Sequence, residues 1–258
     1  MTLIEDIAAC AGIVERGDPD RFAAVMAAPI AQREMLFPLY AFNVEVARAP
    51  WVTQEPLIAE MRLQWWRDAL EEIGGAGPVR RHEVVTPLAA VLDAEGARTL
   101  DTLIEARRAD IDKSAPEGGR AGLIAYLDAT AGTLLWTAAR LAGAGEEGAI
   151  RQAGRAQGVA AYLTAVPDLI ARSHHALPHG DPVEEMAALA DAGLTALDEA
   201  RATRMSRPAR GVLTVMAGVG PVLKAVRKDP ETALSGLVRP VGLTQSLRRA
   251  RAALLGRF

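Results

Sequence analysis

The sequence contains a single cysteine, Cys10, among its 258 residues. One thiol cannot form an internal disulfide or supply a cysteine-rich zinc site, so we expect the chain to work in a reducing compartment. Aromatic residues are also scarce, with three Tyr, four Phe and four Trp. Because aromatic residues favour strands, whereas the abundant Ala, Leu, Arg and Glu favour helices or tolerate them well, this composition predicts a helical protein.

Long apolar runs and flexible linkers are missing as well. No segment reaches the roughly 18–20 uninterrupted apolar residues that a membrane-spanning helix needs, and the best candidate, 211–223, is short and interrupted by glycines. Glu5 and Asp6 stand where a secretory signal would carry basic residues. No Ser-, Gly- or Pro-rich stretch is long enough for a linker. We therefore expect one domain over residues 1–258, cytoplasmic or peripheral on the inner membrane.

Charge of one sign is concentrated at the C-terminal end. The net charge is −3, yet the segment 224–258 holds eight Lys or Arg against two acids and carries +6, which leaves −9 for the rest. Its last part, 243–258, has leucines and arginines at helical spacing. Such a basic amphipathic helix either lies on an anionic membrane surface or caps the core with a solvated arginine face.

Capping residues and apolar periodicity predict an all-α architecture. We find no strand pattern and no internal repeat. The expected helices are 20–28 after Asp18-Pro19, 31–49, a helix capped by Thr53 that ends at 74–75, one or two within 88–113 broken by Gly96, 121–141, 149–171, one opened by Asp181-Pro182, and shorter ones separated by Pro208, Pro221, Pro230 and Pro240. The segment 74–87 is expected to be a loop.

The helices at 121–141 and 149–171 are almost entirely apolar and rich in Ala, Gly and Thr. Helices of this kind lie at the centre of a fold. Their small residues permit either close helix packing or an apolar cavity, and composition alone leaves both open.

Charged and aromatic residues outside these helices have plain structural interpretations. The acidic pairs Asp68/Glu72, Asp101/Glu105 and Asp181/Glu185 are typical of solvated helix faces. His174, His175 and His179 form either a metal site or a solvated loop, and no carboxylate at suitable spacing joins them. Trp65 and Trp66 diverge by about 100° on a helix, so one of them should be buried and the other should contact a partner, a membrane or a half-buried groove.

Several segments, in the right order, resemble the squalene/phytoene synthase family. The first is Leu36-Phe-Pro-Leu-Tyr-Ala-Phe42, followed by the Trp-Arg segment at 64–70, the Tyr-then-Ala-Gly segment at 126–132, and the region from Gly158 to Pro178. The resemblance covers roughly residues 20–178. It implies an isoprenoid synthase fold, in which helices surround a central cavity for two prenyl chains.

The resemblance also implies magnesium chemistry. Ionising an allylic diphosphate creates about three negative charges on the leaving group, which Mg²⁺ stabilises when two facing helices present aspartates one turn apart. In this chain the family's aspartate positions hold other residues: Ala47, Arg48, Trp51, Leu169 and Ser173. Val44 replaces a family arginine. Glu45 should point elsewhere, whereas Asp168 could be re-aimed if Pro167 kinks its helix.

These losses lead to two main hypotheses and a third, intermediate one. Phe42-Asn43-Val-Glu45 and Met61-Arg-Leu-Gln-Trp-Trp66 resemble an aspartate-less branch that includes a mitochondrial complex I assembly factor. That resemblance implies a non-catalytic helper with a protein partner and no cofactor. The alternatives are an active prenyltransferase, in which Arg48, Arg62 or Arg67 takes over from metal or Mg²⁺ is still used, and a carrier that binds a prenyl lipid.

The candidate ligand-binding residues follow from the same resemblance. We expect them to line the central cavity: Tyr40, Asn43, Val44, Arg48, Tyr126, Thr130, Leu134, Tyr162 and Ala165. We assign no catalytic or metal-binding residue. The sequence shows no Ser-His-Asp set, glycine-rich phosphate loop or nucleic-acid-binding module, so we expect no nucleic-acid partner.

Overall fold

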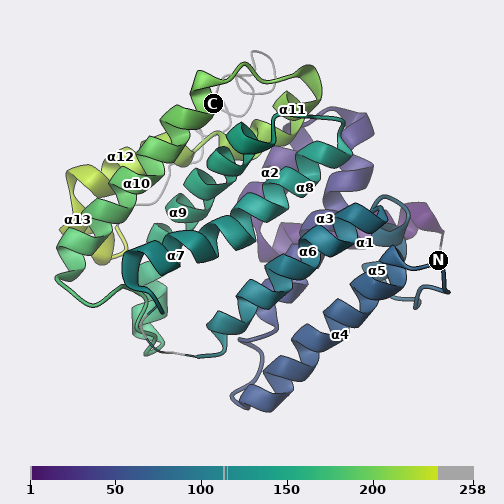
Figure 1. Ribbon diagram of the computed structural model, residues 1–258, viewed down its shortest axis with the longest axis horizontal. Helices are drawn as coiled ribbons and strands as arrows, with labels where there is room; N and C mark the ends of the chain where they lie inside the picture. The colour runs from purple at the N-terminus through teal and green to yellow at the C-terminus, as the bar shows by residue number, and fades with distance from the viewer. Residues whose placement is uncertain (1, 113, 115, 238–258) are drawn as a thin grey trace.

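The computed structural model describes residues 2–112, 114 and 116–237. Over those ranges the regular structure is helical, without a strand (Figure 1), which confirms the all-α prediction. The α-helices are α1 (Leu3–Gly17), α2 (Pro19–Ala27), α3 (Ile30–Arg48), α4 (Pro56–Gly74), α5 (Val85–Ala89), α6 (Ala94–Arg107), α7 (Gly119–Leu127), α8 (Thr133–Leu141), α9 (Glu147–Ala171), α10 (Pro182–Ala202), α11 (Arg207–Val212), α12 (Val219–Lys228) and α13 (Pro230–Leu234). Short turns of other helix types are η1 (Arg108–Asp110), η2 (Asp128–Gly132) and η3 (Leu213–Met216).

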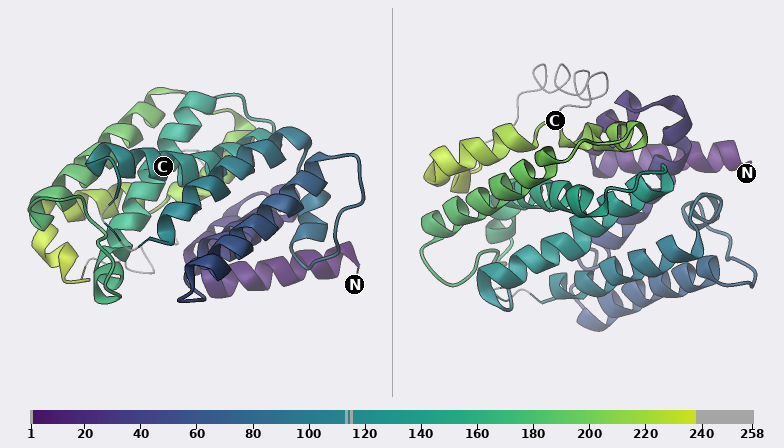
Figure 2. Two further views of the ribbon diagram at one scale, coloured as in Figure 1. Left: turned by 60° about the horizontal axis from the view of Figure 1, so that its bottom comes forward. Right: turned by 45° about the horizontal axis from the view of Figure 1, so that its top comes forward.

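The helices form a row of neighbours with a second group behind it. In Figure 1 the row runs from α12 through α10, α9, α8 and α6 to α4, and each of these helices packs on the next. Helix α3 lies behind α6 and α8, and α1 packs on α3; Figure 2 shows this second group from two other sides. The apolar core is continuous between the two groups, with Tyr40 and Phe42 of α3 among its largest fully buried side chains.

Local caps start the helices where the sequence predicts them. The Asp18 carboxylate accepts the backbone N–H of Arg21 at the start of α2, and Asp181 accepts those of Val183 and Glu184 at the start of α10. Helix α1 is not among the helices expected above. Its signal is a capping box in which the Glu5 N–H donates to Thr2 and the Thr2 N–H donates to Glu5.

Three expected boundaries are wrong. Thr53 does not cap α4: its hydroxyl accepts the N–H of Glu55, and the helix begins at Pro56. The predicted loop 74–87 ends early, because α5 starts at Val85 and contains Pro87. Gly96 does not break a helix but lies in the first turn of α6, where its N–H is capped by Asp93.

The segment 121–141 is not one regular helix. It consists of α7, the π-helical turn η2 and α8. From this turn the Thr130 hydroxyl donates to the Tyr126 carbonyl in α7, and Asp128 pairs with Arg151 at 2.9 Å and Arg155 at 3.5 Å. These side-chain bonds stabilise the π-helical turn, which the spacing of apolar residues in the sequence does not predict.

Helix α9 matches the expected 149–171 within two residues, and its small residues serve close packing. A Cβ on Gly154 would lie 2.7 Å from the Gly132 Cα, and one on Gly158 would lie 2.7 Å from the Ala131 Cβ. Only glycine permits backbones to approach this closely. For these two positions, tight contact between α9 and η2 is therefore the correct interpretation.

The acidic pairs are not simply solvated faces, as the sequence suggested. Arg67 of α4 binds Asp101 and Glu105 of α6, at 2.7 and 2.9 Å. Arg80 binds Glu72 at 2.7 Å. Arg120 pairs with Glu185, which is 8% exposed. The pairs of Arg67 and Arg120 join different helices, which sequence spacing does not predict, whereas Arg80 links the loop after α4 back to that helix.

The C-terminal helices include one apolar stretch, Arg207–Lys228, long enough by composition to cross a membrane. Two thirds of its most apolar window are buried inside the fold, as for a core helix of a water-soluble protein. Pro208, Pro221 and Pro230 lie in the first turns of α11, α12 and α13, where a new helix begins, as expected. The basic helix predicted at 243–258, and Pro240 before it, lie outside the described residues.

Candidate functional site

Helix α3 carries the first family motif, and most of this motif is core. Tyr40 and Phe42 are fully buried, and the Phe42 ring meets the Trp66 ring edge-on with centroids 5.5 Å apart. Trp66 is thus the buried member of the tryptophan pair. Val44, at the position of the family arginine, packs so closely on α1 that a Cβ on Gly17 would lie 2.5 Å from its Cγ1. That position therefore binds α1 through methyl groups and has no charge to offer a ligand.

At the C-terminal end of α3, the family's aspartate positions point in different directions. Arg48 is exposed and pairs with Glu45 at 3.1 Å. Trp51, just beyond α3, is half-buried and stacks on His174, which follows α9, with ring centroids 4.5 Å apart. The Arg172 guanidinium lies 6.0 Å from the Trp51 ring centre. In family enzymes the C-terminal ends of the helices that correspond to α3 and α9 would face each other across metal ions. Here these two ends also lie close together, and the contact between the Trp51 and His174 rings joins them.

The second aspartate region, on α9, shows the same loss of carboxylates. Leu169 lines a hollow, whereas Asp168 one residue earlier is exposed, so Pro167 does not turn this carboxylate toward Leu169's side of the helix. Ser173 follows the helix in a left-handed conformation, with φ of 62°. Neither position brings an acidic oxygen toward Trp51.

A hollow of about 170 Å³ lies beside Leu169. Two tyrosines predicted as cavity residues, Tyr126 and Tyr162, line it together with Asp110 and His174. A neighbouring hollow of about 270 Å³ is lined by Trp51, Arg172 and again by Asp110 and His174. Asp110 and His174 thus stand between two hollows, at the place where the family resemblance puts the diphosphate.

Asp110 belongs to a compact hydrogen-bonded group. The Tyr126 hydroxyl donates to Asp110 at 2.6 Å and accepts from Arg107 at 2.6 Å, while Arg107 also pairs with Asp110 at 3.0 Å. Burial raises the pKa of Tyr126 well above its ordinary value, and the bond to Asp110 adds to this effect. Burial alone would lower the pKa of Arg107, but Tyr126 and Asp110 outweigh it, so that pKa is raised. The carboxylate is therefore already neutralised by a permanent cation.

Sequence reasoning missed Asp110 and Arg107. The two residues are three apart at the junction of α6 and η1, a spacing typical of an ion pair, but they share no family motif with Tyr126. The Tyr162 hydroxyl, in contrast, donates to the Ala176 carbonyl at 2.6 Å and fixes the segment after α9.

The remaining predicted cavity residues do not share one hollow. Several of them are buried in the core: Tyr40, Asn43, Val44, Thr130 and Leu134. Ala165 is partly buried. Arg48 lines an outer hollow of about 430 Å³ with Arg62, Trp65 and His82. Arg67, the third arginine considered for binding a diphosphate, lines a different hollow and is held by its two acids.

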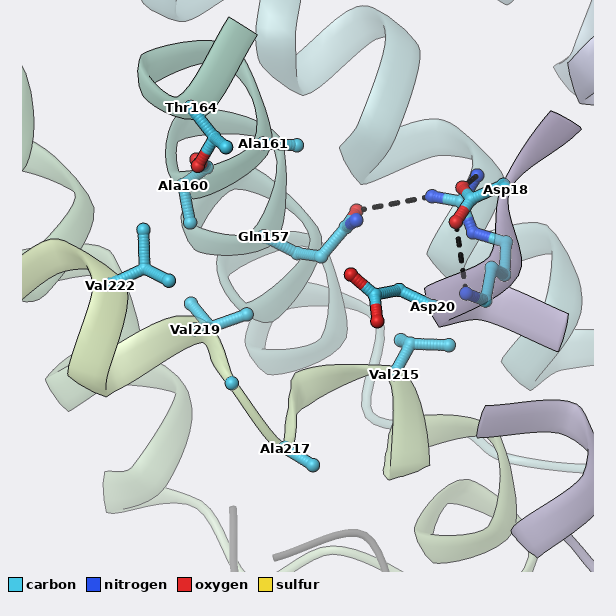
Figure 3. A pocket seen from close by; sticks show the side chains of 12 residues that line it. Asp18, Asp20, Gln157, Ala160, Ala161, Thr164, Val215, Ala217, Val219 and Val222 are labelled. Carbon is cyan, nitrogen blue, oxygen red and sulfur yellow. Dashed lines mark hydrogen bonds and ion pairs between the residues drawn. The ribbon is translucent and has the colours of Figure 1, made fainter. Parts of the chain in front are cut away.

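Another hollow, of about 280 Å³, opens between α2, α9 and α12 (Figure 3). Asp20 and Gln157 face a wall that includes Val215 and Val219, and Arg21 binds Asp18 at 3.0 Å. The Arg21 guanidinium lies 5.0 Å from the Tyr40 ring centre, and within the described part of the chain the Tyr40 hydroxyl has no hydrogen-bond partner. One polar side and one apolar side suit a small amphipathic molecule.

These residues do not fit Mg²⁺. Magnesium requires hard oxygen ligands in near-octahedral geometry. The first motif offers a methyl, a guanidinium and an indole, and the second offers an isobutyl group and one exposed hydroxyl. Across the described ranges no three His, Cys, Asp or Glu side chains are placed to hold a metal ion, the histidines at 174, 175 and 179 included.

Curated relatives are named as respiratory assembly factors. The chain is 29% identical over 166 residues to the NADH dehydrogenase (ubiquinone) complex I, assembly factor 6 homolog of Drosophila melanogaster, covering 61% of this chain and 50% of that protein. It is 26% identical over 162 residues to the Homo sapiens assembly factor 6, covering 61% and 48%. The chain thus spans about half the length of the curated relatives it matches.

Solved structures of similar fold come from enzymes. A dehydrosqualene synthase in complex with a ligand superposes with a TM-score of 0.79 at 14% identity, covering 97% of this chain and 96% of that one. The squalene synthase HpnC from Alicyclobacillus acidocaldarius gives 0.70 at 17% identity, covering 88% and 94%. At such identity the likeness establishes the isoprenoid synthase fold.

The model of one protein family, "Squalene/phytoene synthase", matches residues 14–181, which is more than half of the chain. The match includes both helices with substituted aspartate positions and the hydrogen-bonded group around Tyr126. The chain therefore belongs to the squalene/phytoene synthase family.

Proposed function

We propose that this protein is a non-catalytic member of its family that assists the assembly of a respiratory complex I. The observation that carries the proposal is the contact between Trp51 and His174. It occupies the place where family enzymes need two sets of metal-binding carboxylates. The relatives named as complex I assembly factor 6 support the direction of this proposal.

The electrostatics around that contact support the same proposal. Arg107 neutralises Asp110, and Arg48 is neutralised by Glu45 on the outer side of α3. Among the described residues, a diphosphate carrying about three charges would therefore meet no metal site and few unpaired cations, whereas its stabilisation is the main energetic need of the family reaction.

The helper works through a protein partner in the cytoplasm or at the inner membrane surface. A membrane contact through the basic segment 243–258 and a prenyl-chain ligand belong to the same proposal. The hollow in Figure 3 suits an amphipathic ligand, because a carboxylate and an amide face apolar valines there.

Loss of catalysis is tested by incubating the purified, folded protein with farnesyl or geranylgeranyl diphosphate and Mg²⁺ and measuring diphosphate release. We expect none. Release that disappears in an Arg48→Ala variant would contradict the proposal and support the alternative, a prenyltransferase with a rebuilt diphosphate site.

The assembly role is tested by deleting the gene from its native host and following complex I on native gels together with NADH oxidation by membranes. We expect both to fall and to be restored by the wild-type gene. A Trp51→Asp variant restores one carboxylate but not the full set of metal ligands. If this variant restores complex I in the deletion strain, the restoration therefore reports the helper role and not catalysis. Unchanged complex I after deletion would contradict the proposal.

A further inference from the structure

Four large apolar side chains are exposed together where α3 ends and α4 begins. Val52 is 46% exposed, Leu57 74%, Ile58 45% and Met61 64%. The loop and the first turns of α4 project at the lower edge of Figure 1 and again in the left view of Figure 2. We call these four side chains the α4 tip. Contiguous apolar surface of this kind marks an interaction site in a water-soluble chain.

Packing within the fold does not account for the α4 tip. The opposite side of α4 already contacts the core through Ala59, Leu63 and Trp66, which are buried. Leu57, Ile58 and Met61 follow one another at intervals of one and three residues, so they form a second apolar stripe on the outer side. Helix α4 is therefore apolar on two sides, and only one of them is covered by the described residues.

Arginines flank the α4 tip. Arg62 is exposed and forms no ion pair in the described part of the chain, and Arg48 is exposed with a single partner, Glu45. Both line the outer hollow with Trp65, a half-buried ring with Arg80 above it at 4.8 Å. Proteins that bind the bilayer interface have protruding apolar side chains with arginine and tryptophan behind them. The apolar side chains insert among the lipids, and the cationic side chains bind lipid phosphates.

We propose that the α4 tip inserts into the interfacial region of a phospholipid bilayer, with Arg62 and Arg48 at the level of the phosphate groups. The shape of the surface favours a bilayer over a peptide. Of the four side chains only Val52 lines the outer hollow, and the other three protrude beside it. A flat lipid surface contacts what protrudes, whereas a bound peptide would occupy the hollow.

Flotation of the full-length protein with phosphatidylcholine vesicles, with or without about a quarter phosphatidylglycerol, tests this inference. We expect the wild type to float with the vesicles. A Leu57→Glu/Met61→Glu variant should bind at least tenfold more weakly, because charged side chains resist burial among acyl chains. Circular dichroism and urea unfolding should remain those of the wild type, since both positions are exposed.

Ile30→Glu is the matched control. Ile30 is 75% exposed and starts α3, so it lies about 27 Å from the helix end that leads to the α4 tip. This variant should bind vesicles like the wild type. Arg62→Gln should weaken binding a few-fold on vesicles with phosphatidylglycerol and leave binding to pure phosphatidylcholine nearly unchanged, because only the charge contribution is removed.

Two outcomes would overturn the proposal. Equal binding of the wild type and the Leu57→Glu/Met61→Glu variant would show that another part of the chain, such as 238–258, makes the membrane contact. If the wild type bound neither kind of vesicle, the α4 tip would not be a membrane contact, and a protein partner would be the alternative. Vesicle binding requires no complex I, so either outcome leaves the assembly proposal to its own test.

Discussion

At the scale of single residues, the region of the family's aspartate positions is held by aromatic and hydroxyl contacts. Trp51 contacts His174 and Arg172, and Tyr126 links Arg107 to Asp110. Carboxylates around a metal ion repel one another until the ion is present, whereas these contacts are attractive in the protein alone. The residues at the family's aspartate positions thus lie beside contacts that need no metal ion.

The Trp51 contact should contribute measurably to stability. Trp51→Ala removes a ring stacked on His174, and we expect the free energy of unfolding to fall by about 1–3 kcal/mol from lost burial and ring contact. Urea unfolding measures this change. Val52→Ala, one residue on at a 46% exposed position, should change it by less than about 0.5 kcal/mol. Equal effects would show that the stack is not a stabilising contact.

The Tyr126 hydroxyl should contribute more to the free energy of unfolding than the Tyr162 hydroxyl does. Tyr126→Phe leaves Asp110 and Arg107 without a shared partner in a buried place, which should cost about 1–3 kcal/mol in urea unfolding. Tyr162→Phe removes one bond to a backbone carbonyl and should cost about 1 kcal/mol. A larger loss for Tyr162→Phe would contradict the importance of the charged group.

All three tyrosines of the chain should resist ionisation. Burial raises the pKa of Tyr40 to about 12 and also raises those of Tyr126 and Tyr162. In the unfolded chain tyrosine ionises near pH 10, so the unfolded state loses its protons first and folding stability falls as the pH rises above 10. The slope is about 1.4 kcal/mol per pH unit for each tyrosine ionised only on unfolding. Ultraviolet absorbance of tyrosinate should stay flat near pH 10 in folded protein and rise on unfolding; a normal titration in folded protein would contradict this.

At the scale of helices, glycine placement decides how α9 meets its neighbours. The two glycines at 154 and 158 contact η2 with almost no space, and this contact fixes α9 next to the π turn. Tyr162 and Leu169 follow on the same helix and line one hollow. The position of that hollow therefore depends on backbone contacts made earlier on the same helix.

Gly154→Ala should destabilise the protein, because its Cβ would lie 2.7 Å from the Gly132 Cα and backbone cannot yield as a flexible side chain does. We expect a loss of about 1–3 kcal/mol in thermal or urea unfolding. Gly148→Ala is the control on the same helix: nothing lies within 4 Å of its Cβ, and it should stabilise by up to about 1 kcal/mol. Tolerance of Ala at 154 would contradict the close packing.

At the scale of the whole molecule, the fold of a prenyl-transferring enzyme family is retained without that family's metal ligands. A ligand that binds only the folded state raises the melting temperature, and the stabilisation grows with the logarithm of the ratio of its concentration to its Kd. We expect neither Mg²⁺ nor a chelator to shift the Tm, with or without farnesyl diphosphate. A family enzyme with both aspartate sets serves as the positive control. A magnesium-dependent rise of several degrees would reveal a site that the described residues do not show.

What the sequence determined by itself was local or family-wide. Asp18 and Asp181 predicted helix starts because a cap reaches only two or three residues along the chain. The motif around Tyr40, and the absence of aspartates at positions such as Ala47 and Leu169, identified the family and its altered site. The predictions that Thr53 caps a helix and that Gly96 breaks one were wrong. Whether such a residue caps or ends a helix depends on where the neighbouring turns of the chain lie.

Only the tertiary structure decided which side chains distant in the sequence contact each other. Trp51 and His174 are far apart in the chain, and no local rule pairs them; α3 and α9 both pack on α8, and this arrangement brings the two residues together. The same holds for Arg67 with Asp101 and for Tyr126 with Asp110. Burial and pairing depend on the whole arrangement of helices, since the free energy of such contacts arises only when other segments exclude water from them.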